Sequence, residues 1–290
     1  MRVMSNVSAS AGAVSEALSS SGAAAGGKAG VPAIEFIGVD KRFPARGRAQ
    51  EVLAARNVSL AIQPGEVVSL IGPSGCGKST LLNMGSGLAK PSAGRVLVNG
   101  EPVTGPNKHV AFMLQKDLLM PWRTISQNVE FGLELRGVKA AERRAVSERL
   151  LAQCHLKGFG NSYPHQLSGG MRQRAAMART LAVDPLVLLM DEPFSALDAQ
   201  TKMILQQDLA QTVAASGKTV LFITHDLAEA VALSDRILVM SERPGTIVEE
   251  ILVDIPDRDN PMQRRKHPDV GGYVSRLMDL LKLDAHTDVH

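Results

Sequence analysis

Residues 72–79 read Gly72-Pro73-Ser74-Gly75-Cys76-Gly77-Lys78-Ser79, and this stretch decides the fold. It fits the pattern G-x-x-x-x-G-K-[ST] in full. Glycines let the backbone curl so that successive N–H groups point inward and form a nest for an anion. The apolar run over residues 67–71 precedes the loop, and a helix predicted from Lys78 adds its positive end to the same point. The stretch therefore predicts a loop that binds the phosphates of a nucleotide.

The side chains of this loop suit nucleotide chemistry. Lys78 can reach the β- and γ-phosphates, and the Ser79 hydroxyl can coordinate Mg²⁺. An accidental fit is the alternative, and at ordinary residue frequencies it arises about once in a hundred chains of this length. The strand before and the helix after supply the context that the motif requires. We expect the nucleotide to contact Gly72, Pro73, Ser74, Gly75, Cys76, Gly77, Lys78, Ser79 and Thr80.

A second motif is the apolar run Leu186-Val187-Leu188-Leu189-Met190, which ends in the carboxylates Asp191 and Glu192. A buried strand that ends at a phosphate site can place its first carboxylate beside Mg²⁺ and its second beside the attacking water. We therefore assign Asp191 to the metal and Glu192 to the general base. The alternative is a pair of acidic residues that only ends a strand, and the phosphate loop makes that interpretation the weaker one.

The run Leu167-Ser168-Gly169-Gly170-Met171 lies between these motifs and precedes the helix-like residues 172–181. By itself, Ser-Gly-Gly signals only a turn or a helix start. In this position the sequence resembles the ATP-binding cassette (ABC) ATPases, over about residues 34–282. The resemblance implies an α/β fold with a P-loop NTPase (RecA-like) core, an antiparallel β subdomain and an inserted α-helical subdomain. It also implies ATP and Mg²⁺ as cofactors and hydrolysis of ATP to ADP and phosphate.

The resemblance adds residues of the chain's own nucleotide site. Phe43 matches the aromatic residue that lies against the adenine ring, although a core phenylalanine is the alternative. Gln115, after the strand-like residues 110–114, matches the glutamine that contacts Mg²⁺ and the attacking water. His225 matches the histidine that contacts the γ-phosphate. With Lys78 and Glu192, Gln115 and His225 form the implied catalytic set.

Other residues are implied to act across a dimer. Ser168, Gly169 and Gly170 present a hydroxyl, backbone N–H groups and a helix N-terminus to the γ-phosphate bound by a partner cassette. Residues 195–198 match a loop that communicates between the two cassettes. We therefore expect a homodimer in the assembled complex, with two ATP molecules held between the chains.

Two features indicate the branch of the family. Met171 stands where the broad family has Gln, and Met occurs there in the branch of nitrate, sulfonate and taurine importers. The run Leu118-Leu119-Met120-Pro121-Trp122 also resembles that branch, in a region that receives a short helix of the membrane subunit. Trp122 suits such an interface, but packing inside the helical insertion is an equal alternative.

We therefore expect the ATPase subunit of an importer for a small organic or inorganic anion. Its implied partners are separate permease subunits and, indirectly, an extracytoplasmic substrate-binding protein. Its expected place is the cytoplasmic face of the membrane, as a peripheral subunit. The alternative is a soluble, non-transport ABC ATPase that acts on the ribosome or on DNA.

Composition and motif number weigh against the alternatives. The net charge of +3, from 32 Lys and Arg against 29 Asp and Glu, is too small to indicate a nucleic-acid footprint. Each motif occurs once, which argues against the tandem cassettes of translation factors. The chromosome and repair ATPases split the cassette with a long coiled coil or a zinc module, and neither is present here. No apolar run approaches the roughly 18 residues that span a bilayer, which argues against an exporter fused to its cassette.

The chain divides into one expected domain and two ends. Residues 1–32 are rich in Ser, Ala and Gly, and they offer too little apolar surface to offset the entropy of ordering, so we predict a disordered tail. Apolar residues recur at helical spacing over 273–281 and predict a last helix packed on the core. The predicted ranges are a single ATPase domain over 33–282, with its core over about 33–115 and 182–282, a helical insertion over about 116–181, and a flexible end over 283–290.

The two cysteines, Cys76 and Cys154, are far apart and lack metal-ligand spacing, which fits a reducing compartment. Cys76 lies in the predicted anion nest ahead of a helix. We therefore expect its thiol to be reactive towards alkylating agents, with ATP protecting it.

Overall fold

The computed structural model describes residues 30–44 and 51–281. Of the predicted tail over residues 1–32, only 30–32 fall within the described part, and the predicted flexible end over 283–290 lies outside it. The first strand begins at Ile34, next to the start expected from the sequence.

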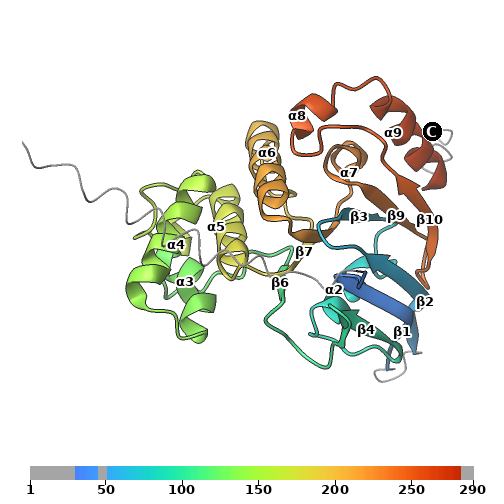
Figure 1. Ribbon diagram of the computed structural model, residues 1–290, viewed down its shortest axis with the longest axis horizontal. Coiled ribbons are helices and arrows are strands. Elements are labelled where there is room, and N and C mark those ends of the chain that lie inside the picture. Colours follow the sequence, from blue (N-terminus) through green and yellow to red (C-terminus); the bar gives the residue numbers. More distant parts are fainter. Residues whose placement is uncertain (1–29, 45–50, 282–290) are drawn as a thin grey trace, which may run out of the picture.

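The centre of the molecule is a six-stranded sheet (Figure 1). Its neighbouring strands run parallel from β6 to β9, and β10 is antiparallel at one edge. Strands β3, β7 and β8 are buried at every residue, because helices and a second sheet cover both faces. In sheet order the strands are β10 (Ile247–Leu252), β9 (Arg236–Met240), β3 (Val67–Ile71), β8 (Thr219–Ile223), β7 (Val187–Asp191) and β6 (Val110–Met113).

A second, antiparallel sheet packs against the first across helix α2 (Lys78–Gly85). Phe36 of this sheet, Leu81 of α2 and Leu189 of β7 belong to one buried cluster. Asn99 and Gly100 both have positive φ and turn β4 back onto β5, as is typical of an Asn-Gly pair. The strands of this sheet are β2 (Val52–Ile62), β1 (Ile34–Phe43), β4 (Ala93–Val98) and β5 (Glu101–Pro102).

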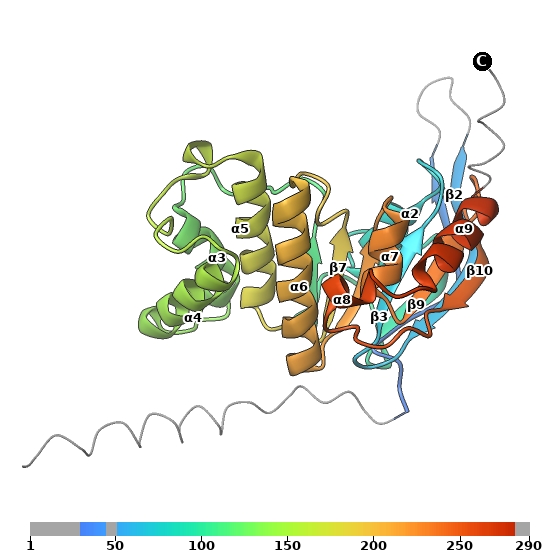
Figure 2. The ribbon, with the colours of Figure 1, turned by 90° about the horizontal axis from the view of Figure 1, so that it is seen from above.

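Three helices gather at one end of the molecule, away from the antiparallel sheet (Figures 1 and 2). They are α3 (Ile125–Leu135), α4 (Ala140–Gln153) and α5 (Gly169–Ala182), with the short helix η1 (Pro164–Gln166) before α5. Thr124 and Gln127 form a reciprocal capping box that starts α3. Helix α6 (Ala199–Ser216) lies between this group and the sheet, and all four helices share one apolar core with β7.

The C-terminal helices are α7 (Leu227–Leu233), α8 (Pro261–Arg264) and α9 (Val270–Leu280). Helices α7 and α9 cover the β9–β10 side of the sheet, and α8 packs against α6 and α7. Leu277 of α9 is fully buried against Ile237 and Ile251, so the predicted packing of a last helix on the core is confirmed. The predicted class is confirmed too: a mostly parallel α/β core, an antiparallel sheet and a helical insertion.

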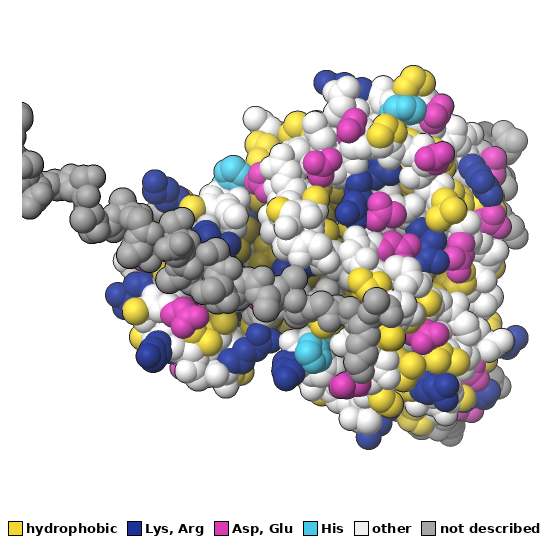
Figure 3. All heavy atoms as spheres, viewed as in Figure 1, with side chains coloured by type: hydrophobic (Ala, Val, Ile, Leu, Met, Phe, Trp, Pro, Cys, Tyr) yellow, Lys and Arg dark blue, Asp and Glu magenta, His cyan; other side chains and the backbone are white. Residues whose placement is uncertain are grey.

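On the face drawn in Figure 3, acidic and basic side chains are interspersed over the α/β part of the molecule. Among the described residues, no helix is both long enough and apolar enough to cross a membrane.

Candidate nucleotide-hydrolysis site

The sheet topology brings the predicted site residues to one edge. Strands β3, β6, β7 and β8 run parallel, so their carboxyl ends meet at the same edge of the sheet. The loop 72–77 follows β3, Gln115 follows β6, Glu192 follows β7, and Thr224 and His225 follow β8. Residues far apart in the sequence are therefore gathered by strand order alone.

The phosphate loop has the backbone that its glycines predict. Gly77 has φ 111°, and a Cβ atom there would lie 2.7 Å from the carbonyl oxygen of Ala54. Gly72 has φ 156°, a backbone conformation that residues with a side chain rarely adopt. The Lys78 ammonium group donates to the carbonyl oxygens of Gly72 at 2.7 Å and Pro73 at 2.9 Å, and the side chain is only 5% exposed. The Lys78 ammonium group is thus held inside the phosphate loop by backbone carbonyl oxygens.

One surface depression joins this loop to the ends of β7 and β8. Gly72, Pro73 and Cys76 shape the loop but do not line the depression. Phe43 lines it at the end of β1 and is 43% exposed, so the alternative of a core phenylalanine is wrong. The predicted residues that line it are Phe43, Ser74, Gly75, Gly77, Lys78, Ser79, Thr80, Glu192 and His225.

The Glu192 carboxylate is held from two sides. The Nε2 atom of His225 lies 2.7 Å from Oε1 of Glu192, and Nε2 of Gln115 donates to Oε2 at 3.0 Å. The backbone N–H of Glu192 donates to the carbonyl oxygen of Ile223, and φ of 49° turns the residue sharply out of β7. Two predicted catalytic side chains, those of His225 and Gln115, thus meet at the carboxylate of a third, Glu192.

Asp191 lies deeper than Glu192. It is only 7% exposed, and this burial raises the pKa of its carboxyl group, while a hydrogen bond with the Ser79 side chain acts in the opposite direction. A carboxylate, a hydroxyl and the amide oxygen of Gln115 are the oxygen ligands that Mg²⁺ prefers. A cation would also offset the cost of burying the carboxylate. Ser79 and Asp191 therefore fit Mg²⁺, whereas Gln115 bonds Glu192 instead of this pair.

Ser168, Gly169 and Gly170 do not join the chain's own phosphate loop. Ser168 caps α5, its hydroxyl accepting from the N–H of Met171 at 3.3 Å, and none of the three lines the depression. Helix α5 belongs to the helical group, whereas the phosphate loop opens α2 between the two sheets (Figure 1). Within the described residues, this helix start therefore lies outside the depression that contains the chain's own phosphate loop.

One expectation from the sequence is wrong, and one alternative interpretation is excluded. Cys76 is only 1% exposed, which contradicts an accessible, reactive thiol. Trp122 is 73% exposed, which rules out packing inside the helical insertion.

Sequence reasoning also missed residues of the depression. Val52, Ala54 and Arg243 line it together with the predicted set. Val52 pairs with Phe43 across β1 and β2, and pairing of this kind needs the sheet register. Arg243 belongs to Arg243-Pro244-Gly245, which in the sequence signals only a turn.

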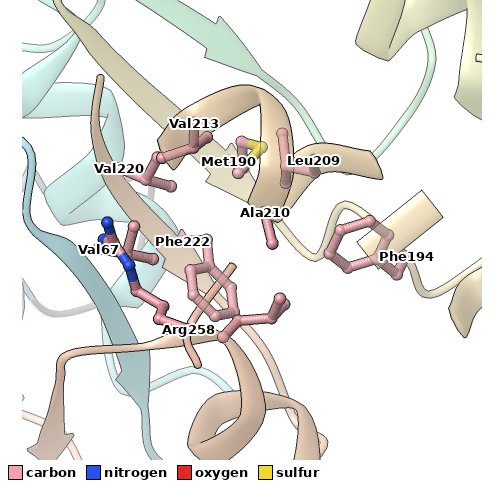
Figure 4. A pocket seen from close by; sticks show the side chains of 10 residues that line it. Val67, Met190, Phe194, Leu209, Ala210, Val213, Val220, Phe222 and Arg258 are labelled. Atoms are coloured by element: carbon pink, nitrogen blue, oxygen red, sulfur yellow. The ribbon is translucent and has the colours of Figure 1, made fainter. Parts of the chain in front are cut away.

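A second cavity does not compete for the nucleotide. It measures about 20 Å³ and lies between α6 and the sheet, with Phe194, Leu209 and Phe222 among its walls (Figure 4). Arg258 is the charged group in its lining, and its guanidinium already bonds Asp235 and the carbonyl oxygen of Gly65. Such an apolar space, about the size of one water molecule, is a dry packing void.

Comparisons with known protein families point the same way. The family model described as ABC transporter matches residues 55–195. An uncharacterised ABC transporter ATP-binding protein of Methanocaldococcus jannaschii is 48% identical over 231 residues, which cover 80% of this chain and 85% of that protein. The nitrate import ATP-binding protein NrtD of Synechocystis is 42% identical over 241 residues, or 81% of this chain and 91% of that protein. The taurine import ATP-binding protein TauB of Yersinia pestis is 45% identical over 205 residues, or 71% and 80%.

Solved structures share the fold. A dimeric post-hydrolysis state of the ATP-binding cassette MJ0796, bound to ADP and Pi, superposes with a TM-score of 0.70 at 34% sequence identity. The match covers 76% of this chain and 98% of that one.

Proposed function

Because this chain belongs to the family of ABC transporter ATP-binding proteins, we propose that it powers import of a small organic or inorganic anion through a separate membrane permease. The chain is an ATPase with the ABC ATPase fold, and its activity drives transport. Relatives named for nitrate import and taurine import support the class of substrate. The observation that carries the proposal is a single depression that combines a phosphate loop with Glu192 and His225.

The phosphate loop binds the nucleotide. The N–H groups of residues 75–80 and the N-terminus of α2 hold the phosphates, and Phe43 stacks on the adenine ring at the open end of the depression. Lys78 exchanges the carbonyl oxygens of Gly72 and Pro73 for phosphate oxygens.

Glu192 acts on the attacking water. As a general base it takes the proton of the water that attacks the γ-phosphate. His225 and Gln115 orient this carboxylate in the present geometry, and both can contact the γ-phosphate or the water once these are bound. The contacts of Gln115 and His225 with Glu192, and the place of Lys78 in the same depression, support one catalytic set of Lys78, Gln115, Glu192 and His225.

Ser79 and Asp191 would hold Mg²⁺, and Gln115, whose Nε2 atom now donates to Glu192, would join them through its amide oxygen. When bound, the ion neutralises charge on the phosphate oxygens. The hydrogen bond between Ser79 and Asp191 keeps these two ligand groups together, with Asp191 buried and Ser79 exposed in the depression.

The catalytic unit is a homodimer. Ser168, Gly169 and Gly170 form an exposed helix start outside the chain's own site, which suits contact with the γ-phosphate of a partner chain. The dimeric MJ0796 cassette supports this assembly. Closure of two such chains on two ATP molecules would supply the motion, and hydrolysis would reset it.

The permease docks beside Trp122. This exposed tryptophan adjoins a polar groove between α3 and α4, whose walls alternate basic and acidic side chains. An aromatic anchor next to charged walls suits a short helix with an apolar residue and charges of its own. The charged lining residues are Arg123, Glu130, Glu134, Arg143, Arg144 and Glu148.

We place the ATPase activity in residues 33–282, as one domain with a helical insertion over about 116–181. The subunit would lie peripherally at the cytoplasmic face of the membrane, where ATP is available, and an extracytoplasmic binding protein would deliver the anion to the permease.

The proposal is tested by identifying the partner. A tagged Glu192→Gln chain is expressed in its native cell, stabilised with Mg-ATP, solubilised gently and purified, with the parent chain in ADP as the control. A multi-spanning membrane protein enriched over the control is the expected result. Ribosomal or DNA-associated proteins without a membrane partner would keep the ATPase activity and contradict the role in import.

A further inference from the structure

The loop between β9 and β10, residues 241–246, packs against the nucleotide site and has no role so far. The N–H of Gly245 donates to the carbonyl oxygen of Ala54 at 3.0 Å, and the N–H of Arg56 donates to that of Gly245 at 2.9 Å. A Cβ atom on Gly245 would lie 2.1 Å from the carbonyl oxygen of Cys76. Only glycine permits so close an approach, so this loop and the phosphate loop form one packed unit.

Arg243 extends from this loop and bonds the backbone of the phosphate loop. Its Nε and Nη2 atoms donate to the carbonyl oxygen of Gly75 at 3.0 and 2.7 Å. In a trans peptide the C=O of Gly75 and the N–H of Cys76 point in opposite directions, so this contact fixes the plane of that peptide. Gly75 has φ 75° and no side chain to restrict it. The N–H of the same peptide, that of Cys76, donates to the carbonyl oxygen of Pro73 at 3.4 Å, so Arg243 holds this part of the anion nest from its other side.

The charge of Arg243 also faces the site. Its side chain is exposed and lines the depression together with Phe43, Ser74 and Lys78. Within the described part of the chain, its hydrogen bonds go to Gly75 alone, and no carboxylate pairs with it. The guanidinium charge of Arg243 therefore borders a site for anionic phosphates.

We propose that Arg243 is a positioning residue of the nucleotide site, which helps to orient the Gly75–Cys76 peptide and adds a positive charge at the border of the site. It raises the affinity for the phosphates of the nucleotide and takes no part in the hydrolytic step. The inference rests on the proposed nucleotide site. The affinities for ATP and for ADP rise alike, because Arg243 bonds the phosphate loop and contacts neither Glu192 nor His225 within the described chain.

The test compares full-length variants of matched charge. In Arg243→Gln, the dissociation constants of ATP and ADP, measured by calorimetry at low salt, and the KM for ATP should all rise about tenfold, as expected for loss of a charge-assisted contact. The kcat at saturating ATP should stay within about twofold, because the catalytic side chains are untouched. Arg95→Gln, which removes an exposed arginine outside the depression, should change neither. Raising the salt concentration should shrink the difference between parent and Arg243→Gln.

A second variant covers the case in which Arg243→Gln does not fold. Arg243→Lys keeps the charge but not the forked contact, so its KM and dissociation constants should rise about threefold. Unchanged affinity in a folded Arg243→Gln chain, or a fall in kcat with KM unchanged, would overturn the proposal, as would an unchanged KM in Arg243→Lys.

Lys78→Ala distinguishes failure of the proposed nucleotide site from failure of the role of Arg243. If that chain binds ADP as the parent does, the nucleotide lies elsewhere and the proposed site fails. If it is defective while Arg243→Gln binds normally, only the role of Arg243 fails.

Discussion

The imidazole of His225 and the carboxylate of Glu192 are in direct contact, with Nε2 of the ring 2.7 Å from Oε1 of the carboxylate. They stand at the ends of β8 and β7, neighbours in a parallel sheet, so the contact follows from strand order. Glu192 is 17% exposed at its side chain and His225 is 48% exposed, which leaves one side of the pair open to the depression. The geometry therefore orients the proposed base before any substrate is positioned.

Replacing His225 should mainly reduce turnover. In His225→Ala, Glu192 keeps the hydrogen bond from Gln115 but loses the ring that orients it, and the phosphate loop is unchanged. We expect kcat to fall by roughly a hundredfold, within the range for a lost acid–base contact, and the KM for ATP to change by less than about threefold. Steady-state phosphate release measures both.

His155 supplies a matched control. Its Nε2 atom also lies 2.8 Å from a carboxylate, that of Asp208, but outside the depression. His155→Ala should keep the parent kcat. An equal loss of activity in both variants would mean that His225 acts only through stability.

Mixing two inactive variants should restore activity if the site is shared across a dimer. Lys78→Ala disables a chain's own phosphate loop, and Ser168→Arg disables the helix start that we propose it lends to its partner. In a mixed dimer one site combines both lesions and the other has neither, so a 1:1 mixture should recover about a quarter of the parent rate by symmetry. No recovery over a range of chain concentrations would contradict the shared site.

Trp122 should matter to the complex more than to hydrolysis. Trp122→Ala removes an exposed aromatic anchor beside the groove between α3 and α4, so association with the permease should weaken about tenfold or more. The ATPase rate of the isolated chain should be unchanged. Leu252→Ala removes an equally exposed apolar side chain from β10, at the opposite end of the molecule, and should leave association intact (Figure 1). Equal weakening by both variants would argue against docking at Trp122.

Neither thiol should react in the folded protein. Cys76 and Cys154 are 1% and 3% exposed, and burial, aided by the nearby Asp208 charge, raises the pKa of the Cys154 thiol to about 12. Near neutral pH, Cys154 therefore has almost no thiolate. We expect less than about a tenth of a thiol per chain to react with an aromatic disulfide reagent under native conditions, and both to react in guanidinium.

Cys154→Ala provides the control for the thiol count, with one reactive thiol after unfolding. Rapid reaction of one thiol in the native parent, lost on replacing Cys76, would restore the expectation of a reactive phosphate-loop cysteine.

The buried strands of this fold are predictable because their signals are local. The apolar run over residues 67–71 is β3 as the structure has it, and the run ending at Met190 is β7 to within one residue. Strand β2, by contrast, runs from Val52 to Ile62 without one continuous apolar run. Residues such as Arg56 and Asn57 in that stretch are exposed and polar, so no apolar pattern marks them. There the pairing with β1 decides the structure, and sequence pattern alone does not show it.

Part of the site is predictable for the same reason. The phosphate loop is contiguous, and Asp191 with Glu192 ends a strand, so their chemistry can be inferred from short motifs. The contact between Arg243 and Gly75 joins residues separated by 168 positions, and a turn signal says nothing about what the turn packs against. Exposure is equally invisible in the sequence, which is why Cys76 and Trp122 could be settled only by the structure.

The role of Glu192 as general base is tested most directly by Glu192→Gln. The amide keeps the size of the side chain and can still contact His225 and Gln115, but it cannot accept the proton of the attacking water. We predict that ATP binds with the parent affinity while steady-state hydrolysis falls by roughly a hundredfold or more. Glu134→Gln, which neutralises a carboxylate paired with Arg123 outside the depression, should hydrolyse ATP like the parent. Hydrolysis by Glu192→Gln near the parent rate would contradict the assignment.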